Sequence, residues 1–568
     1  MLAKSNLVRI RLITGAAIFV AALLLSRLYL VQIVRGEEYR EKADRQYSRP
    51  NAELWDRGSI FFTTKDGAPV SAATLRQGFL LAIIPKEIED AESAYRSLSE
   101  HIALDREAFL AKASKADDPY EEVATHIDPE TAEKILAKKI LGVALFKERW
   151  RFYPGEDLAS NVLGFVGFDG DRRLGRSGLE RYYEDILARG EGELYRNFFA
   201  EIFLGAKKVA TKGGEGDIVT AIEPTVEQYL EGNLEKLVTE FRAKRAGGII
   251  MDPKSGRIYA MALYPSFDPN EYGRERDPSR FTNSLVENVY EMGSILKPIT
   301  MASGLDAGVV TATTTYFDSG TLTLNTKTIS NFDGKGRGRV DMQEVLSQSL
   351  NTGAATVALK LGGNRFRDYF SRFGFGSETG IDLPGEAKGL TQNLESGRDI
   401  ELVTASYGQG IALTPIQTVR ALAALGNGGY LVTPHVATKI HYKIGTTRSV
   451  SDYAREPVIS EEASEEITRM LVRVVDTALL EGAYKMPNHT IAAKTGTALI
   501  ANPAGGGYYS DRYLHSFFGY FPAYDPQFIV FIYLVEPQGV MYASHTLTVP
   551  FMSIAKFLIN YYEIPPDR

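Results

Sequence analysis

Near its C-terminus the chain reads HSFFGYFPAYDPQFIVFIYLV, residues 515–535, and this segment says more about the architecture than any other. Two apolar runs, His515–Phe521 and Phe528–Val535, are rich in aromatic and β-branched residues, which favour β-strands. Pro522–Pro526 between them holds the Pro and Asp residues that are typical of a turn. The segment therefore predicts two strands joined by a turn.

A second pair of strands is predicted earlier in the chain. Ala246–Met251 and Arg257–Ala262 are apolar runs, and the intervening Asp252-Pro253-Lys254-Ser255-Gly256 is a hairpin signal. Ahead of them, Asp217–Ile222 reads as a further strand. Because strands open and close this region and helices lie between them, we expect an antiparallel sheet flanked by helices, within a multi-domain α+β chain.

An amphipathic helix is expected between the strand that ends at Ile222 and the hairpin. Apolar residues recur there with α-helical spacing on one face: Val226, Leu230, Leu234, Leu237 and Phe241. Thr225 and Gln228 at its start match a capping box, in which two side chains bond the free backbone N–H groups of the first turn. The pattern predicts a helix whose first turn is capped by Thr225.

The composition of this 568-residue chain excludes several classes of protein. The net charge is −7 and no Lys- and Arg-rich run dominates any stretch, so no nucleic-acid binding is expected. The absence of cysteine removes disulfides, thiolate metal sites and cysteine nucleophiles. No close metal-binding pair occurs among the histidines, each expected to be a surface or packing residue: His101, His126, His435, His441, His489, His515 and His545. We expect no metal ion and no other cofactor.

A long apolar run near the N-terminus predicts a membrane anchor. Leu12–Val34 is 23 residues long with one charge, and as a helix it would span about 34 Å, enough for a bilayer core. Three basic residues precede it, so the positive-inside rule places residues 1–11 in the cytoplasm and the rest of the chain outside. A cleaved signal peptide would share the basic start, but the run is not followed by an A-x-A site, which favours an uncleaved anchor.

The rest of the chain is expected to divide at the glycine-rich stretch Gly213–Gly216. Before it, strand-like runs such as Phe79–Ile84 alternate with helical stretches such as Glu130–Lys139. We expect four parts, a cytoplasmic tail, an anchor helix, a mixed α/β domain and an α+β domain, with the bounds 1–11, 12–34, 35–216 and 217–568.

Ser294-Ile295-Leu296-Lys297 forms an S-x-x-K motif. On a helix, positions i and i+3 share a face, so the lysine amine would lie beside the serine hydroxyl. The lysine can then take the serine proton as a base if burial and neighbouring charges lower its pKa. Gly293 and Pro298 suit a helix that begins near Ser294, although an ordinary helix start would look the same.

Ser349-Leu350-Asn351 forms an S-x-N motif, 55 residues (349 minus 294) after Ser294. A hydroxyl and an amide at this spacing can shuttle a proton and hold a substrate carbonyl. Ser-x-Asn also favours turns and caps, so the motif indicates little by itself.

Lys494-Thr495-Gly496-Thr497 follows the strand-like run Thr490–Ala493. A glycine in a strand marks a close backbone approach by a ligand. The lysine supplies a cation and the threonines supply hydroxyl donors, which suits a carboxylate. A polar edge strand would give the same pattern.

The three motifs together are much more specific than each alone. S-x-x-K, S-x-N and K-T-G in this order are typical of class A β-lactamases and penicillin-binding proteins. Over nearly its whole length the chain resembles a class B penicillin-binding protein of the cell-division or rod-elongation type. Other stretches that carry the resemblance are Arg57-Gly58-Ser59-Ile60, Arg151-Phe152-Tyr153-Pro154-Gly155, Gly178-Leu179-Glu180 with Tyr183, Pro265-Ser266-Phe267-Asp268-Pro269-Asn270, Gly408-Gln409-Gly410 and Ile564-Pro565-Pro566-Asp567.

The resemblance implies an elongated pedestal (dimerisation or regulatory) domain over residues 35–216 and a penicillin-binding transpeptidase domain over residues 217–568. It implies that Ser294 attacks the penultimate carbonyl of a D-Ala-D-Ala stem peptide, and that backbone N–H groups of Ser294 and Thr497 form the oxyanion hole. β-Lactams would acylate the same serine. The implied catalytic residues are Ser294, Lys297, Ser349, Asn351 and Lys494, and the implied substrate-binding residues are Thr495, Gly496 and Thr497.

The resemblance also implies a place for the protein in the cell. It implies a single-pass protein of the cytoplasmic membrane whose catalytic domain lies outside and cross-links peptidoglycan. No glycosyltransferase domain precedes the pedestal, so a polytopic membrane glycosyltransferase and other division or elongation proteins are the implied partners. The length and the lack of a long insertion favour septum formation over lateral-wall synthesis.

Several alternatives stay open at this point. An elongation-type transpeptidase or a D,D-carboxypeptidase would share the motifs. A β-lactamase is disfavoured because the chain is long and has no convincing E-x-x-x-N element, and a β-lactam sensor would need a larger cytoplasmic module. A non-catalytic scaffold of the division complex would not need the five polar motif residues together.

Overall fold

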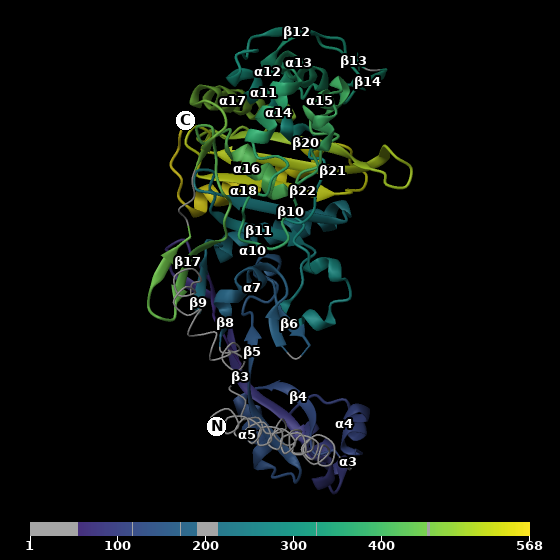
Figure 1. Cartoon of the computed structure of the whole chain (residues 1–568), viewed down its shortest axis with the longest axis vertical. Helices are drawn as coiled ribbons and strands as arrows, with labels where there is room; N and C mark the ends of the chain where they lie inside the picture. Colours follow the sequence, from purple (N-terminus) through teal and green to yellow (C-terminus); the bar gives the residue numbers. More distant parts are fainter. Residues whose placement is uncertain (1–54, 116–117, 171, 190–213, 325, 451–454) are drawn as a thin grey trace, which may run out of the picture. The chain divides into compact units, whose positions relative to one another are not determined.

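The computed structural model describes residues 55–115, 118–170, 172–189, 214–324, 326–450 and 455–568. The described residues fold as two compact units (Figure 1): residues 55–56 with Arg76–Trp150, and Arg57–Leu75 with the described part of Arg151–Arg568. Residues of the predicted pedestal therefore occur in both units. The predicted anchor, Leu12–Val34, and Gly213 lie outside the described residues, and within the described ranges there is no helix that is long and apolar enough to cross a membrane.

In the smaller unit, three helices pack against the strands β3 (Pro69–Ile83), β4 (Glu121–Ile127) and β5 (Val143–Phe152). The later part of β3 pairs with β4 and with β5. Its helices are α3 (Ala91–Ser99), α4 (Arg106–Ala113) and α5 (Pro129–Ala137). Each helix is capped by an aspartate whose carboxylate accepts from the backbone N–H three residues on. The strand predicted at 79–84 and the helix predicted at 130–139 are confirmed.

The larger unit is built around a five-stranded sheet, whose strands all pair in an antiparallel way. In order across the sheet they are β11 (Ile258–Tyr264), β10 (Arg245–Met251), β22 (Phe528–Val535), β21 (Tyr508–Phe521) and β20 (Ala492–Ala501). The predicted antiparallel sheet flanked by helices is confirmed. Strands from the two ends of this region lie side by side because β10 pairs with β22.

Helices cover both faces of this sheet (Figure 1). On one face, α10 (Pro224–Phe241) and α18 (Ala543–Tyr561) pack against alternate residues of β22 such as Ile532. The intervening residues, such as Phe531, belong to the core that includes α11 (Lys297–Asp306). Because successive strand residues point to opposite faces, a strand buried on both sides must be apolar throughout, as β22 is.

Helix α10 is confirmed, but its predicted cap is wrong. The side chain of Glu223 accepts a hydrogen bond of 2.7 Å from the backbone N–H of Val226, so Glu223 is the N-cap. Pro224 has no N–H to satisfy and fits the first helical position, which places Thr225 inside the helix.

The larger unit has further helices and strands around this sheet. The helices are α6 (Ser160–Leu163), α7 (Gly178–Tyr182), α8 (Glu184–Leu187), α12 (Met342–Ser347), α13 (Asn351–Leu361), α14 (Gly363–Arg372), α15 (Asp399–Ala405), α16 (Pro415–Ala423) and α17 (Glu461–Arg473). β2 (Ile60–Thr63), β9 (Gly216–Thr220), β17 (Ala437–Tyr442) and β18 (Thr447–Ser449) belong to the seven-stranded sheet that contains β3: β2 pairs with the first residues of β3 and with β9, and β17 pairs with β9 and β18. The two-stranded sheets pair β1 (Asp56–Arg57) with β8 (Ala188–Arg189), β6 (Val166–Asp169) with β7 (Arg172–Gly175), β12 (Thr315–Asp318) with β15 (Gly338–Asp341), β13 (Thr321–Leu324) with β14 (Lys327–Ser330), and β16 (Tyr430–Leu431) with β19 (Glu456–Pro457).

A buried charge network joins three of the stretches that carry the family resemblance. The fully buried carboxylate of Glu180 accepts hydrogen bonds of 2.6 Å from both Arg57 Nε and Arg151 Nε. The hydroxyl of Tyr153 lies 3.2 Å from the same carboxylate. These residues are distant in sequence, and the need to pair a buried charge explains why they meet.

Glu180→Gln is expected to destabilise the larger unit by about 3–5 kcal/mol, because it removes the buried carboxylate that pairs with both guanidinium groups, while Arg57 keeps its pair with Glu184 at 2.7 Å. The midpoint of denaturant unfolding should fall accordingly. The matched control is Glu466→Gln, which removes an exposed pair with Arg469 and should change the free energy of unfolding by less than about 1 kcal/mol. Equal effects from both variants would contradict a structural role for the buried network.

Candidate active site

Ser294 and Lys297 lie on one short helical turn. The turn Gly293–Leu296 is the 3-10 helix η5, and the regular helix α11 begins at Lys297, slightly later than predicted. Because a 3-10 helix has three residues per turn, positions i and i+3 are aligned. Gly293 has a φ of +65°, and a Cβ there would lie 2.8 Å from the carbonyl oxygen of Thr497. Only glycine lets the turn lie this close to strand β20.

Strand β20 brings the K-T-G-T sequence alongside this turn. A Cβ on Gly496 would lie 2.4 Å from Ser516 Oγ and 2.7 Å from the carbonyl oxygen of Met292. The Ser516 hydroxyl donates a hydrogen bond of 2.9 Å to that same carbonyl. The close approach at Gly496 is made to the backbone of Met292 and to the side chain of Ser516. It fixes the edge of the sheet against the segment that leads to Ser294.

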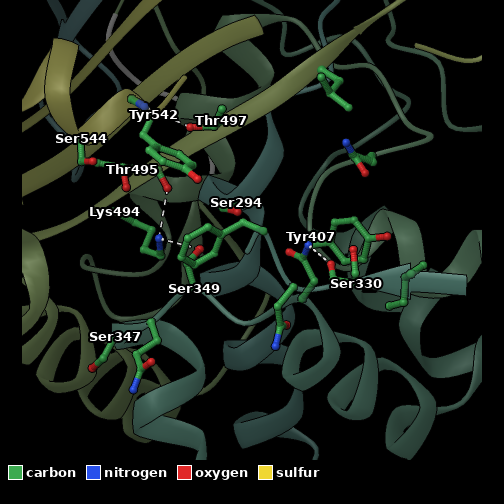
Figure 2. A pocket seen from close by; sticks show the side chains of 18 of the residues that line it. Ser294, Ser330, Ser347, Ser349, Tyr407, Lys494, Thr495, Thr497, Tyr542 and Ser544 are labelled. Atoms are coloured by element: carbon green, nitrogen blue, oxygen red, sulfur yellow. Dashed lines mark hydrogen bonds between the residues drawn. The ribbon is translucent and has the colours of Figure 1, made fainter. Parts of the chain in front are cut away.

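Ser349 connects the two motif lysines. It lies between α12 and α13, with Nζ of Lys297 at 3.0 Å and Nζ of Lys494 at 3.1 Å from its hydroxyl oxygen. Nζ of Lys297 also donates to the carbonyl oxygen of Ser349 at 2.5 Å. Figure 2 shows Ser294, Ser349 and Lys494 pointing into one cavity. The backbone of Ser349 is left-handed, with a φ of +54°, a conformation that costs a non-glycine residue about 1–2 kcal/mol and is common at functional sites.

The two lysines are buried, and this changes their protonation. Burial lowers the pKa of Lys297 well below its ordinary value, and the positive charge of nearby Lys494 lowers it further. Burial also lowers the pKa of Lys494, to about 8. Two cations sharing one hydroxyl would repel each other, so the arrangement favours a neutral Lys297 beside a charged Lys494. A neutral lysine amine three residues after Ser294 can accept a proton.

Asn351 occupies a different position from the other motif residues. It begins α13, and its Nδ2 donates a hydrogen bond of 2.8 Å to the carbonyl oxygen of Ser330. It still lines the cavity. The structure therefore brings Ser349 and the lysines together and leaves Asn351 beside them, facing the space that a ligand would fill.

A cavity of about 1460 Å³ unites the predicted site residues. Six of these residues line its wall: Ser294, Ser349, Asn351, Lys494, Thr495 and Thr497. Lys297 and Gly496 are not among the lining residues. The oxygen of the Thr497 hydroxyl accepts a hydrogen bond of 3.0 Å from the backbone N–H of Ala543, at the start of α18. In the described part of the chain there is no group of three His, Asp or Glu side chains that could hold a metal ion.

One pair at the cavity was missed by the sequence analysis. The Tyr508 hydroxyl donates to the Glu291 carboxylate, with distances of 3.0 and 3.1 Å to its two oxygens. Tyr508 lines the cavity, and burial raises the pKa of Glu291 to about 7. The pair ties strand β21 to the segment just before Ser294. Neither residue belongs to a motif, and they are 217 positions apart, so no local pattern could have found them.

Comparison with known families agrees with this arrangement. Residues 246–555 match the family model described as the penicillin binding protein transpeptidase domain. Residues 56–197 match the model described as the penicillin-binding protein dimerisation domain.

Curated relatives match along nearly the whole chain. Stage V sporulation protein D of Bacillus subtilis is 29% identical over 540 residues, covering 92% of this chain and 81% of that protein. Peptidoglycan D,D-transpeptidase FtsI of Escherichia coli is 25% identical over 577 residues, covering 98% of this chain and 92% of that protein.

Solved structures share the fold. Penicillin binding protein 3 of Mycobacterium tuberculosis, complexed with aztreonam, superposes with a TM-score of 0.69 at 21% identity, covering 91% of this chain and 98% of that one. Penicillin binding protein 2X of Streptococcus thermophilus gives a TM-score of 0.72 at 19% identity, covering 90% and 81%. The architecture is therefore that of known penicillin-binding proteins.

Proposed function

The chain belongs to the penicillin-binding protein transpeptidase family, and from this we propose that it is a peptidoglycan D,D-transpeptidase that cross-links stem peptides by serine acyl transfer. The observation that carries the proposal is the convergence of Ser349 Oγ with the amines of Lys297 and Lys494 beside the Ser294 turn. Relatives named as D,D-transpeptidases support it.

The acylation step assigns a role to each residue of this cluster. Ser294 Oγ attacks the penultimate carbonyl of a D-Ala-D-Ala terminus, and its proton passes to the neutral amine of Lys297. Backbone N–H groups of Ser294 and Thr497 stabilise the oxyanion of the tetrahedral intermediate. The C–N bond then breaks, and D-Ala leaves with a proton delivered from Lys297 through Ser349. Lys494 keeps the Ser349 hydroxyl oriented and its charge holds Lys297 neutral.

The cross-link forms in the second step. An amine of a neighbouring stem peptide attacks the carbonyl of the Ser294 ester and gives up a proton to Lys297. The acyl C–O bond then breaks, the new amide forms, and Lys297 returns the proton to Ser294 Oγ. The hydroxyls of Thr495 and Thr497 hold the donor carboxylate before it leaves, and the Asn351 amide holds a carbonyl of the donor peptide. Gly496 lets strand β20 approach the Ser294 turn. A β-lactam presents the same carbonyl and carboxylate and acylates Ser294.

The place of this reaction follows from the N-terminal sequence. We propose that Leu12–Val34 anchors the chain in the cytoplasmic membrane, with residues 1–11 inside and the catalytic domain outside. Residues 35–216 act as the pedestal and 217–568 as the transpeptidase domain. A polytopic membrane glycosyltransferase supplies the glycan strands, and the enzyme works in septum formation, with lateral-wall synthesis as the second candidate.

The full-length protein, purified in detergent, tests the proposal with nascent peptidoglycan strands. We expect cross-linked dimers and released D-Ala in equal amounts, because each transfer forms one cross-link and expels one D-Ala. Release of D-Ala without dimers would identify a carboxypeptidase. No D-Ala release and no penicillin adduct would identify a non-catalytic scaffold.

A further inference from the structure

His515 is fully buried in strand β21, and both of its ring nitrogens have partners. Nε2 lies 3.0 Å from the carbonyl oxygen of Met541, and Nδ1 lies 2.8 Å from the hydroxyl oxygen of Thr546. Both partners belong to one segment, the approach to α18 and its first turn. The histidine is therefore a bridge between strand β21 and the start of this helix, and not the simple packing residue that its sequence context predicts.

The chemistry of the two partners fixes the protonation of the ring. A carbonyl oxygen can only accept, so Nε2 carries the hydrogen and donates it to Met541. Nδ1 then has a lone pair and accepts from the Thr546 hydroxyl, which lies closer to this nitrogen, at 2.8 Å, than to its other acceptor, the carbonyl oxygen of Ala543, at 3.2 Å. Burial lowers the pKa of His515 to about 4, although the Met541 carbonyl favours the charged form and opposes this effect. A neutral ring of one tautomer holds the segment in place.

The segment that His515 holds reaches the substrate-binding strand. His515 pairs directly with Thr497 across the β20–β21 ladder. Between the two residues that His515 contacts lies Ala543, whose backbone N–H donates a hydrogen bond of 3.0 Å to the Thr497 hydroxyl oxygen. Figure 2 shows Tyr542 and Ser544, on either side of Ala543, beside Thr495 and Thr497 at the cavity wall.

We propose that His515 is a positioning residue for the donor carboxylate: it holds the start of α18 so that Ala543 orients the hydroxyl of Thr497 toward the substrate. The hydroxyl oxygen of Thr497 already accepts from Ala543, so its own hydrogen is left to donate to a carboxylate in the cavity. The inference rests on the proposed transpeptidase function and names a residue of that same site.

The test compares acylation by benzylpenicillin with acylation by its methyl ester, in which the carboxylate is masked. His515→Phe keeps a flat buried ring but loses both hydrogen bonds. In the full-length protein it should slow acylation by benzylpenicillin about tenfold or more, because a hydrogen bond to a charged group is lost. Acylation by the ester should stay at its wild-type rate. His515→Gln, which can still donate to Met541, should recover part of the lost rate.

A double-mutant cycle shows whether the effect passes through Thr497. In a Thr497→Val background, His515→Phe should have no further effect on the ratio of the two rates, because the hydroxyl that it orients is gone. The matched control is Tyr520→Phe, at a residue on the same strand as His515. This substitution removes a buried hydrogen bond of 2.8 Å between Tyr520 and Thr468. This control should leave the ratio unchanged.

The outcomes separate this inference from the proposed function. Equal slowing of both compounds by His515→Phe and by His515→Gln would show a general structural role and overturn the proposal. An unchanged ratio in both variants would overturn it as well. Failure of the wild-type protein to react with either compound would instead overturn the transpeptidase function on which the proposal rests.

Discussion

Ser294→Ala is expected to lose cross-linking and penicillin acylation by a factor on the order of 10⁴ to 10⁶, because the atom that forms the acyl ester is removed. The fold should be unaffected, since Ser294 is half-buried and loses only its hydroxyl. The rate of D-Ala release, measured on nascent peptidoglycan with the full-length protein, gives the size of the loss.

Ser347→Ala is the matched control for this variant. Ser347 lines the same cavity, and its hydroxyl accepts a hydrogen bond of 3.2 Å from Gln343 but contacts neither lysine in the described structure. We expect its rate to stay within about threefold of the wild type, because the reacting atoms are untouched. A Ser294→Ala variant that still forms a covalent penicillin adduct would remove Ser294 from the centre of the mechanism.

Lys297→Met is expected to slow acylation by about 10²–10⁴-fold, the usual contribution of a general base. Methionine matches the length of the lysine side chain but cannot accept a proton. The stability of the protein should rise, because a lysine whose pKa is depressed in the folded state opposes folding. That gain is largest below the folded-state pKa and vanishes as the pH rises above about 10.4, where unfolded lysine is also neutral.

The pH profile distinguishes a base from a structural residue. In the wild type, acylation should fall as the pH drops through the lowered pKa of Lys297, because the amine becomes charged. Lys494→Met removes the neighbouring positive charge, so the pKa of Lys297 should rise and the profile should move to higher pH. Lys327→Met, at an exposed lysine that also lines the cavity, is the control and should not move it. A profile that stays in place in Lys494→Met would contradict the electrostatic coupling of the two lysines.

The parts of the fold that the sequence predicts best are those in which the local pattern and the burial agree. Phe528–Val535 is apolar at every position because both of its faces are covered, and its predicted bounds are those of β22. Strand β21 starts at Tyr508, earlier than predicted, because its first residues are polar and mostly exposed, although the strand still pairs with β20 there. The periodicity of apolar residues shows which strand residues are buried, but it does not show where the pairing of two strands continues outside the core.

The candidate site, too, has features that the local sequence predicts and features that it does not. Ser294 and Lys297 are three residues apart, and their proximity follows from helical spacing alone. The left-handed backbone of Ser349 and the bridge made by His515 depend on contacts between distant segments. Such contacts arise when a buried polar group must find a partner, and a single sequence does not show which partner it finds.

The measurement that tests the central claim most directly is mass spectrometry of the full-length protein after incubation with a penicillin, alongside Ser294→Ala. We predict a stable adduct of the mass of the intact drug, located on the peptide that contains Ser294 and absent from the variant. An adduct on another residue, or hydrolysis of the drug without any lasting adduct, would contradict the proposal that Ser294 is the acylated nucleophile of a transpeptidase.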